Sequence, residues 1–488
     1  MQTGVTTSTA ASIHSQHDDV PLFVDLDGTL LKTDLLIESA LFLLKRQPWM
    51  LLMLPFWLAF GRARLKEEIA KRAVLDFDVL PLQPEFVAFL ESEAGHRRTL
   101  VLATASDRRL AEPVAQRLRI FRDVLASEGH RNLKGARKLE AIEAYCQCGA
   151  FDYAGNEHAD LAIWAKSRRC VVVNSSRGVV AELNRRNCEV QRVFDDRPPL
   201  AKTWVRGLRI HQWAKNLLLG VPILTSHSFT LSAVVEIAMA FVAFSLVASA
   251  TYLLNDLLDL ASDRHHPRKC KRPLAAGDIG LAAGTVSLVV LMGAGFGLAF
   301  RLSDDFLFTL LAYLALTVSY TFFLKRLAII DVLVLASLYT SRIVAGAFAI
   351  DVALSSWLLG FSMFIFLSLA LVKRCTELLM IQKSSHDNLK GRGYHVSDYP
   401  MLSTMGVSAG YISVLVLALF ISSPGGVSQY SHPVYLWMLC PLMAYWVSRL
   451  WLKTSRSEMH DDPLLFSLKD RSSWIVFLGL TIVSLISL

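Results

Sequence analysis

The pattern of apolar positions changes near residue 200 of the 488-residue chain. Before that point, apolar runs are short and separated by charged residues, as in a soluble domain. After it, they reach the length of a membrane-spanning helix. Nine apolar segments, of which the first is short, lie near residues 213–225, 231–254, 281–300, 306–323, 327–348, 355–372, 403–422, 433–451 and 472–488. The pattern predicts a multidomain chain in which residues 200–488 form an all-α bundle of nine transmembrane helices.

The soluble part is predicted to be an α/β domain over residues 19–199. The runs at Leu22–Val24 and up to Thr104 are predicted strands that end at polar residues. In a parallel sheet, catalytic groups lie where strands end, at their carboxyl edge. The stretch DDRPP, Asp195–Pro199, breaks regular structure and marks a linker. Residues 1–18 are rich in Ser and Thr without an apolar run, which predicts a disordered tail.

An insertion over residues 35–75 separates the two strands. Its run Trp49–Phe60 holds twelve apolar residues interrupted by Pro55, too short to cross a bilayer. Basic residues such as Lys45 and Lys66 flank it, as in an element that lies on anionic headgroups. An ordinary helical cap that buries its own apolar face fits the pattern equally well. Both interpretations remain open.

The charge distribution indicates a membrane protein rather than a nucleic-acid-binding one. The formal net charge is +8, but the basic residues gather in short loops between apolar segments. With the soluble part on the cytoplasmic side, nearly all loop Lys and Arg fall on that side, and the opposite loops hold essentially Arg301 alone. The seven cysteines form no CxxC pair, which fits a reducing compartment. We expect a multi-pass protein of the cytoplasmic membrane with its active sites on the cytoplasmic face.

The sequence DLDGT follows the first predicted strand. It places Asp25 as a nucleophile and Asp27 as a general acid/base, a pair that needs a metal ion to offset its mutual repulsion. The motif resembles that of the haloacid dehalogenase-like phosphohydrolases, a Rossmann-like α/β family with a cap, which implies Mg²⁺ at this site.

That resemblance assigns the later motifs one residue at a time. Thr104 would bind the phosphoryl group, and Lys138, with Lys134 as the weaker choice, would neutralise the phospho-aspartate. The fourth motif of the family reads GDxxxD, but here it is YAGNEHAD, so Asn156 takes the first metal-ligand position and Asp160 the second. An amide in place of a carboxylate removes one negative charge from the metal site. Both a working phosphatase and a weakened or purely structural domain are therefore retained.

A ladder of oxygen donors follows the second apolar segment. Asn255, Asp259 and Asp263 repeat at i, i+4 and i+8, with Asp256 beside them, so on a helix they line one face. Such groups repel one another unless a cation lies between them, and Mg²⁺ is the ion that shares carboxylates with a substrate's phosphates. A basic block that could hold a diphosphate comes next: Arg264, His265, His266, Arg268, Lys269, Lys271 and Arg272. The alternative is a solvated loop that only fixes topology.

Further polar residues lie at the same ends of the apolar segments. Lys215, Tyr320, Lys325, Lys373 and the acids Asp461 and Asp462 are the main ones. Arg342 lies deeper, eleven residues after Asp331, about 16 Å away along a helix. A charge at that depth marks a site or a structural ion pair between helices. We expect these groups to converge on an anionic substrate.

The stretch NDxxDxxxDRxHPxKxxRPxAxG resembles the UbiA superfamily of intramembrane transferases, and more closely its polyprenyl-phosphate phosphoribosyltransferase branch. The motifs QWAKN, LKR and HDDPLLFSLKDR support that branch. Most members carry a second motif, DxxxD, but here Leu335 stands where its second acid should be, with Asp331 as the first.

The resemblance implies transfer of 5-phosphoribose from phosphoribosyl diphosphate to a polyprenyl phosphate. Asp256 and Asp259 would be the principal catalytic acids, with Mg²⁺ as the metal, and Asp25 could then remove the 5-phosphate of the product. Two alternatives are an aromatic prenyltransferase that uses a prenyl diphosphate, and a transport or lipid-binding protein with an inactive phosphatase-like domain. A homo-oligomer is left open.

Overall fold

The computed structural model describes residues 20–129, 132–147, 149–382, 392–423, 428, 430–459 and 462–488. The predicted tail, residues 1–18, lies outside the described residues. The chain divides into two compact units. The first, here the sheet unit, contains Met1–Gly207 together with Asp256–Val286, and the second, the bundle unit, contains Leu208–Asn255 and Ser287–Leu488.

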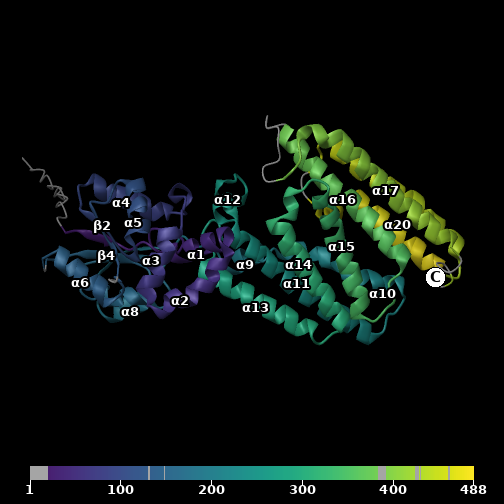
Figure 1. The fold of residues 1–488 in the computed structure, drawn as a ribbon. Coiled ribbons are helices and arrows are strands. Elements are labelled where there is room, and N and C mark those ends of the chain that lie inside the picture. Colours follow the sequence, from purple (N-terminus) through teal and green to yellow (C-terminus); the bar gives the residue numbers. More distant parts are fainter. Residues whose placement is uncertain are drawn as a thin grey trace, which may run out of the picture. The chain divides into compact units, whose positions relative to one another are not determined.

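The sheet unit is built on six parallel strands. They are β1 (Leu22–Val24), β2 (Leu100–Asp107), β3 (Asp123–Ser127), β4 (Asp152–Gly155), β5 (Cys170–Val173) and β6 (Val190–Phe194). The order in the sheet is β3-β2-β1-β4-β5-β6, with neighbouring strands parallel (Figure 1). This order reverses its direction at β1, which is the switch point of a doubly wound fold. The predicted α/β fold of this part is confirmed.

Both faces of the sheet are buried because successive strand residues point to opposite sides. Leu22 and Val24 join one apolar core, and Phe23 joins the other. The first core is closed by α4 (Pro84–Gly95) and α5 (Arg108–Leu118). The second is closed by α6 (Ala136–Tyr145), α7 (Leu161–Trp164) and α8 (Val179–Arg185). The short η2 (Phe77–Val79) and η3 (His158–Asp160) connect these elements.

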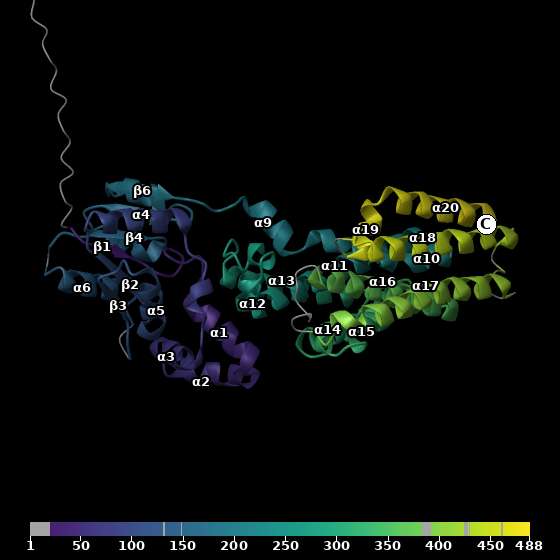
Figure 2. The same ribbon diagram turned by 90° about the horizontal axis from the view of Figure 1, so that it is seen from above.

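The insertion forms a small helical layer, here the cap (Figure 2). It consists of α1 (Leu35–Arg46), the 3₁₀ helix η1 (Pro48–Met53), α2 (Leu54–Ala59) and α3 (Arg62–Arg72). Leu43, Trp57 and Ile69 bury one another in a core of their own. The opposite side chains of the apolar run remain exposed. The insertion therefore has the helical structure of a cap and also an apolar surface.

The segment after the second span also lies in the sheet unit. The helix α11 (Leu231–Leu258) ends just before Asp259, which begins the short α12 (Leu260–His265). The 3₁₀ turn η5 (Lys269–Lys271) and a turn at Gly277 then lead to α13 (Leu281–Ala299). Residues 256–277 are called the acid loop below. The predicted domain boundary at residue 199 had placed these residues with the membrane part instead.

The remaining helices build the bundle unit. They are η4 (Ile210–Gly220), α10 (Val221–Thr225), α14 (Asp304–Phe322), η6 (Leu324–Arg326), α15 (Ile330–Ala349), α16 (Ser356–Gln382), η7 (Val396–Asp398), α17 (Tyr399–Ser422), η8 (Pro433–Met438), α18 (Leu439–Ser455), α19 (Pro463–Lys469) and α20 (Arg471–Ser487). The helix α9 (Leu200–Gly207) precedes them in the sheet unit.

In the described part of the chain, six helices are long and apolar enough to cross a membrane, or seven if the bent pair α19 and α20 counts as one span. These helices define a multi-pass membrane protein. All nine predicted segments fall on helical structure, but the first is split into η4 and α10 and the eighth into η8 and α18. Nine complete spans therefore stay a prediction.

Candidate functional site

Asp25 lies at the carboxyl end of β1 in the sheet unit. Its side chain is buried, and Lys138 Nζ donates to its Oδ1 at 2.7 Å. The Thr29 hydroxyl donates to Oδ2 at 3.4 Å. Burial raises the pKa of Asp25 to about 6, and the Lys138 ammonium opposes that rise. The structure thus brings the predicted nucleophile and the predicted lysine into contact.

Asp27 points to the neighbouring strand and to the cap. Its Oδ2 accepts a hydrogen bond from the Ser106 hydroxyl at 2.5 Å, and its Oδ1 accepts one from the backbone N–H of Leu35 at 2.9 Å. Burial raises the pKa of this carboxyl to about 7. A carboxyl that holds its proton near neutral pH suits a general acid. The predicted phosphoryl-binding Thr104 is buried beside it, and its Oγ1 accepts the N–H of Ser106 at 3.0 Å.

Asn156 and Asp160 occupy the loop after β4 but differ in what they offer. Asp160 Oδ2 accepts the backbone N–H groups of Asn156 at 3.2 Å and Glu157 at 3.1 Å, and its Oδ1 accepts the Tyr153 hydroxyl at 2.9 Å. Asn156 Oδ1 is buried and has no hydrogen-bond partner. Because a buried polar atom without a partner is costly, this oxygen is the one suited to a metal ion. The Asn156 loop is held against the DLDGT turn, where Gly28 has a φ of +76° and a Cβ would meet Asn156 Cγ at 3.2 Å.

The donor set of this site fits Mg²⁺. Across the described residues, His, Cys, Asp and Glu side chains form no cluster of three or more that could hold a metal ion. Here the Asp25 carboxylate would be joined by the amide oxygen of Asn156, and substrate phosphate would complete the oxygen set that Mg²⁺ prefers. The metal role of Asp27 stays a prediction beside its role as general acid. Asp160 anchors the loop through its hydrogen bonds, and its role as a metal ligand stays a prediction.

Three residues of this site were missed by sequence reasoning. Ser106 is two positions after Thr104, on the same face of β2, so strand periodicity could have identified it. Tyr153 receives a hydrogen bond from Lys138 Nζ at 3.0 Å. Lys66 on α3 donates to the Ala105 carbonyl at 2.8 Å, and burial lowers its pKa. Lys66 was interpreted only as a charge that flanks the apolar run, because its contact with β2 is not visible in the sequence.

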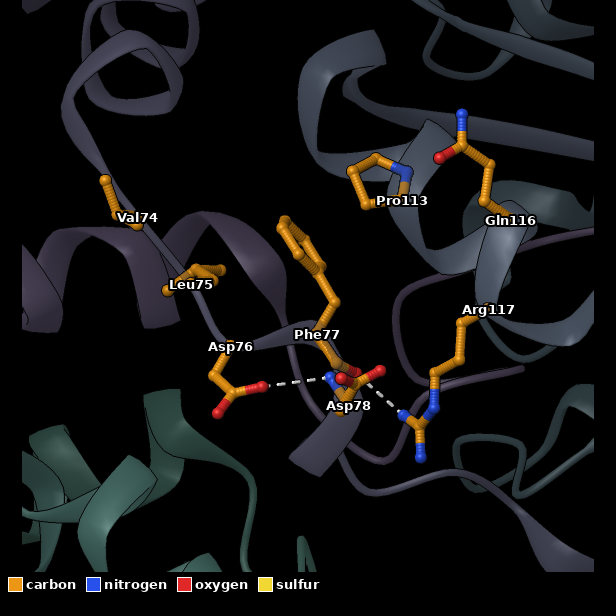
Figure 3. A pocket seen from close by; sticks show the side chains of 8 residues that line it. All are labelled: Val74, Leu75, Asp76, Phe77, Asp78, Pro113, Gln116 and Arg117. Atoms are coloured by element: carbon orange, nitrogen blue, oxygen red, sulfur yellow. Dashed lines mark hydrogen bonds between the residues drawn. The ribbon is translucent and has the colours of Figure 1, made fainter.

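A surface pocket of about 590 Å³ lies apart from these residues, between the end of the cap and α5 (Figure 3). The Arg117 guanidinium donates to the Phe77 carbonyl at 2.8 Å across it. None of the predicted catalytic residues lines this pocket. It is not a candidate for the chemistry.

Two acids of the acid loop share one cation, and a third pairs with a lysine of α1. Arg272 Nη1 contacts Asp256 Oδ1 at 3.0 Å and Asp263 Oδ2 at 2.6 Å, and Lys45 Nζ contacts Asp259 Oδ1 at 2.7 Å. One guanidinium nitrogen bridges two carboxylates, so a single cation can serve both. Burial raises the pKa of Asp263, and Arg272 opposes that rise. Asp256 and Asp263, with the oxygens of a diphosphate, form a donor set that fits Mg²⁺.

Two residues of the predicted basic block have other partners. Arg264 is buried: its guanidinium pairs with Glu38 at 2.5 Å and its Nε donates to the Ala275 carbonyl at 3.0 Å. In this structure it ties the loop to α1 instead of facing a diphosphate. His266 Nδ1 accepts the backbone N–H of Arg268 at 3.2 Å, and burial and Lys269 lower its pKa, which disfavours a cationic role. Lys269 is exposed, and Arg272 pairs with Asp256 of the acid loop. Binding of the diphosphate by these two residues stays a prediction.

In the bundle unit, Asp331 is fully buried and its carboxylate is engaged on both oxygens. Arg374 pairs with Oδ2, and Tyr320 donates to Oδ1 at 2.8 Å. Arg392 lies 3.4 Å from Oδ1. Tyr320, predicted to bind substrate, is thereby part of a network that joins α14, α15 and α16. Together with Leu335 at the next motif position, this network leaves no pair of acids there for a second metal ion.

A second buried network surrounds Asp462, the N-cap of α19. Lys215 Nζ contacts Asp462 Oδ2 at 2.5 Å, Lys373 Nζ lies 3.7 Å from the same oxygen, and Tyr339 donates to it at 3.2 Å. The structure brings two of the predicted substrate-binding lysines together around one carboxylate, which leaves an excess of positive charge. Lys325 is on η6, and Asp461 lies outside the described residues.

Arg342 is buried on α15, and the hydrogen-bond partners of its guanidinium among the described residues are neutral groups. Its Nε donates to Asn216 Oδ1 at 2.9 Å and its Nη2 to the Tyr313 hydroxyl at 3.2 Å. Its guanidinium lies 5.1 Å from the centre of the Tyr313 ring. The structural ion pair considered for Arg342 is therefore not what holds it, because its partners are neutral groups and aromatic rings. A buried cation with neutral partners suits an anionic ligand.

The apolar spans, the acid loop and the buried cations define a multi-pass membrane protein equipped to bind anionic substrates. The chain belongs to the UbiA prenyltransferase family, whose profile matches residues 218–478. The predicted superfamily is thus confirmed, and the chain is a UbiA family transferase.

Three relatives differ in how much of the chain they share. An uncharacterized protein, y4nM, of Sinorhizobium fredii is 36% identical over 468 residues, which cover 95% of this chain and 90% of that protein. The nodulation protein NoeC of Azorhizobium caulinodans is 36% identical over 281 residues, 57% of this chain and 91% of that protein. The decaprenyl-phosphate phosphoribosyltransferase of Mycobacterium tuberculosis is 34% identical over 200 residues, 40% of this chain and 66% of that protein.

One solved structure is similar to part of this chain. A UbiA homolog from Archaeoglobus fulgidus bound to GPP and Mg²⁺ is 14% identical, with a TM-score of 0.45, over 58% of this chain and 99% of that one.

Proposed function

We propose that the chain is a polyprenyl-phosphate phosphoribosyltransferase, which moves 5-phosphoribose from phosphoribosyl diphosphate to a polyprenyl phosphate. The similarity to decaprenyl-phosphate phosphoribosyltransferases supports this proposal at 34% identity over 200 residues. The excess of loop Lys and Arg on one side supports a cytoplasmic active site in the cytoplasmic membrane.

The pairing of Asp331 with Arg374 is the observation that favours phosphoribosyl diphosphate over a prenyl diphosphate as the donor. A prenyl diphosphate donor in this family would use a second acid motif, DxxxD, for another metal ion. Here Asp331 is neutralised by Arg374 and the second position is Leu335. The alternative, aromatic prenyl transfer, lacks that half of its site. Transfer from a soluble diphosphate to a lipid phosphate needs one acid motif and additional cations, and both are present.

The chemistry follows from where charge develops. The bond between ribose C1 and the diphosphate oxygen breaks, so positive charge grows on the ribose ring and negative charge on the departing diphosphate. Mg²⁺ held by Asp256 and Asp263, with Asp259 next to them in the acid loop, would supply Lewis-acid stabilisation of that diphosphate. Lys269 and Arg272 would bind its remaining oxygens, which stabilises the transition state more than the ground state.

The acceptor needs little help from a base. An oxygen of the polyprenyl phosphate is already anionic and attacks C1 from the face opposite the leaving group, forming the new C1–O bond. Lys215, Lys373 and Arg342 would hold this phosphate through their positive charge. The products are polyprenyl-phospho-5-phosphoribose and diphosphate.

The test uses membranes that contain the full chain, labelled phosphoribosyl diphosphate and a polyprenyl phosphate, with and without Mg²⁺. We expect lipid-soluble label only with the metal, and its loss in Asp259→Ala. Glu128→Gln, at an exposed acid outside the site, is the matched control and should retain transfer. Lipid label from a prenyl diphosphate and an aromatic acceptor instead would reject the proposal.

We also propose that the Asp25 site hydrolyses the 5-phosphate of that product. The contact of Asp25 with Lys138, the raised pKa of Asp27 and the unpartnered oxygen of Asn156 support a working site rather than a structural remnant. Asp25→Asn should abolish release of inorganic phosphate from the lipid product while transfer continues. Phosphate release at the wild-type rate from that variant would rule out this second activity.

A further inference from the structure

Helix α1 connects the Asp25 site to the acid loop within the sheet unit. At its N-terminus, Leu35 N–H donates to Asp27 at 2.9 Å, and the N-cap Asp34 accepts the N–H of Ile37 at 3.0 Å. In its last turn, Lys45 pairs with Asp259. The helix has 12 residues and spans about 18 Å. It is a rigid connection between one predicted catalytic acid and another.

One contact between the helix and the loop is a buried ion pair, whose atoms Glu38 Oε1 and Arg264 Nη2 are close together without the alignment of a hydrogen bond. Glu38, in the first turn of α1, pairs with Arg264 at 2.5 Å, and the two side chains are 4% and 6% exposed. Burial raises the pKa of Glu38, and the Arg264 guanidinium opposes that rise. Because an uncompensated buried charge is strongly unfavourable, neither partner can lose the other without a shift of the loop. Exposed ion pairs such as Lys45 with Asp259 add little by comparison.

Two more contacts fix the same loop. His265 Nε2 lies 2.8 Å from Oδ2 of Asp76, the N-cap residue of η2. Gly277 adopts a φ of +77°, and a Cβ at this position would lie 2.8 Å from the Lys32 carbonyl oxygen. The loop therefore approaches the backbone just after the DLDGT motif so closely that only glycine fits there. A groove of about 260 Å³ between the loop and α1 is lined from both sides, by Leu41 and Phe42 and by Leu258 and Ala261.

We propose that Glu38 is a positioning residue of the transferase: through Arg264 it holds the acid loop in the conformation in which Asp256 and Asp263 share one cation. The phosphatase-like part of the chain thus supplies part of the framework of the diphosphate site. This inference rests on the proposed function for its kinetic arm only. The predicted role of Arg264 changes accordingly, from a ligand of the diphosphate to the link between loop and cap.

The kinetic arm compares Glu38→Gln and Arg264→Gln with the wild-type full chain in membranes. Both should raise KM for phosphoribosyl diphosphate by roughly 2- to 30-fold, the range for residues that act through others, and leave KM for the polyprenyl phosphate unchanged. The double variant should be no worse than Arg264→Gln, because Glu38 acts only through Arg264. Glu112→Gln, which breaks an exposed pair with Arg108, is the matched control.

The structural arm needs no substrate. Trypsin can cleave after Arg264, Arg268, Lys269 and Lys271, whereas Pro273 protects the bond after Arg272, so the cleavage rate of this loop in intact membranes reports how firmly it is held. Glu38→Gln should be cleaved faster than the wild type and the Glu112→Gln control. If Glu38→Gln fails to fold, Gly277→Ala replaces it, since the added methyl group displaces the loop from Lys32 without removing a charge.

The two arms separate the possible failures. Wild-type membranes that transfer no phosphoribose would reject the proposed function, while the trypsin rates would still decide whether Glu38 holds the loop. Unchanged cleavage with an unchanged KM would overturn the inference. A fall in kcat alone, with KM for both substrates unaltered, would also overturn it, because positioning of the diphosphate site must show in the affinity for the diphosphate.

Discussion

Asn156 is the residue on which the activity of the Asp25 site depends. Its buried Oδ1 has no protein partner, whereas the neighbouring Asp160 accepts hydrogen bonds from two backbone N–H groups and the Tyr153 hydroxyl. Loss of groups that merely support a metal ligand costs about 10- to 100-fold in metal affinity, so loss of a direct ligand should cost at least as much. We therefore expect Asn156→Ala to lower Mg²⁺-dependent phosphate release by at least roughly 10-fold.

The matched variant is Asn156→Asp, which restores the carboxylate of the family motif. It should bind Mg²⁺ more tightly than the wild type, as seen in a lower Mg²⁺ concentration for half-maximal phosphate release. Equal rates for Asn156→Ala and the wild type would show that this oxygen is not a ligand.

Asp331 is expected to stabilise the bundle rather than bind a metal. It is fully buried against Arg374, and breaking a buried pair by removing one partner costs about 3–5 kcal/mol. Asp331→Asn should therefore lower the Tm of the detergent-purified chain, while the Mg²⁺ dependence of transfer in membranes stays unchanged. A shifted Mg²⁺ requirement at an unaltered Tm would assign Asp331 to a metal site instead.

At the residue scale, the sequence could predict groups whose position follows from their own element. Asp25 comes directly after a strand, so its place at the sheet edge needs no knowledge of the rest of the fold. Arg264 was misjudged because its partner Glu38 is far away in sequence, and a basic residue beside an acid motif looks like a ligand until its burial is known. Lys66 was missed for the same reason.

At the element scale, the run Trp49–Phe60 keeps both of its interpretations. Leu43, Trp57 and Ile69 form a cap core, yet Trp49, Leu52, Phe56 and Phe60 are each more than half exposed. A surface of this kind beside basic residues suits the interface of an anionic membrane. The two interpretations could not be separated from the sequence, because both predict the same amphipathic pattern.

We expect this exposed face to lie in the membrane interface. Amide hydrogen exchange of residues 48–60, measured on the full chain in nanodiscs, should be slower with anionic than with neutral lipids. The double substitution of Phe56 and Phe60 by Asp should remove that difference, whereas Val74→Asp, at an exposed residue outside the run, should not. Exchange that is independent of lipid charge in every variant would favour the cap interpretation alone.

The helices show the limits of apolar patterns in another way. Each predicted segment coincides with helical structure, but residues 210–225 form a 3₁₀ run followed by a short helix with Pro222 in its first turn. Proline removes a backbone donor and favours the start of a new helix. Hydropathy measures how much of a segment is apolar and does not register a proline that interrupts its helix. For this reason the positions of the segments were predicted better than the continuity of the spans.

At the scale of the whole molecule, the two proposed activities would share one intermediate, the phosphorylated polyprenyl product. We expect this lipid to stay in the bilayer in which it forms. Each buried methylene adds about 0.8 kcal/mol to membrane anchoring, so a polyprenyl product does not leave its bilayer. An Asp25→Asn chain should make the phosphorylated lipid but not hydrolyse it, and an Asp259→Ala chain should do the reverse. Reconstituted in the same vesicles, the two variants should together form dephosphorylated lipid, whereas in separate vesicles mixed afterwards they should not.

The outcomes of this mixing experiment distinguish three routes. Equal phosphate release from mixed separate vesicles would mean that the Asp25 site acts on a soluble ester, since only such a substrate crosses between vesicles. Failure even in shared vesicles, with wild-type chain active alongside, would mean that the lipid passes between the sites of one chain without release. Complementation in shared vesicles only is the result expected of a lipid intermediate that diffuses in the bilayer, and its rate should rise with the density of the Asp259→Ala chain.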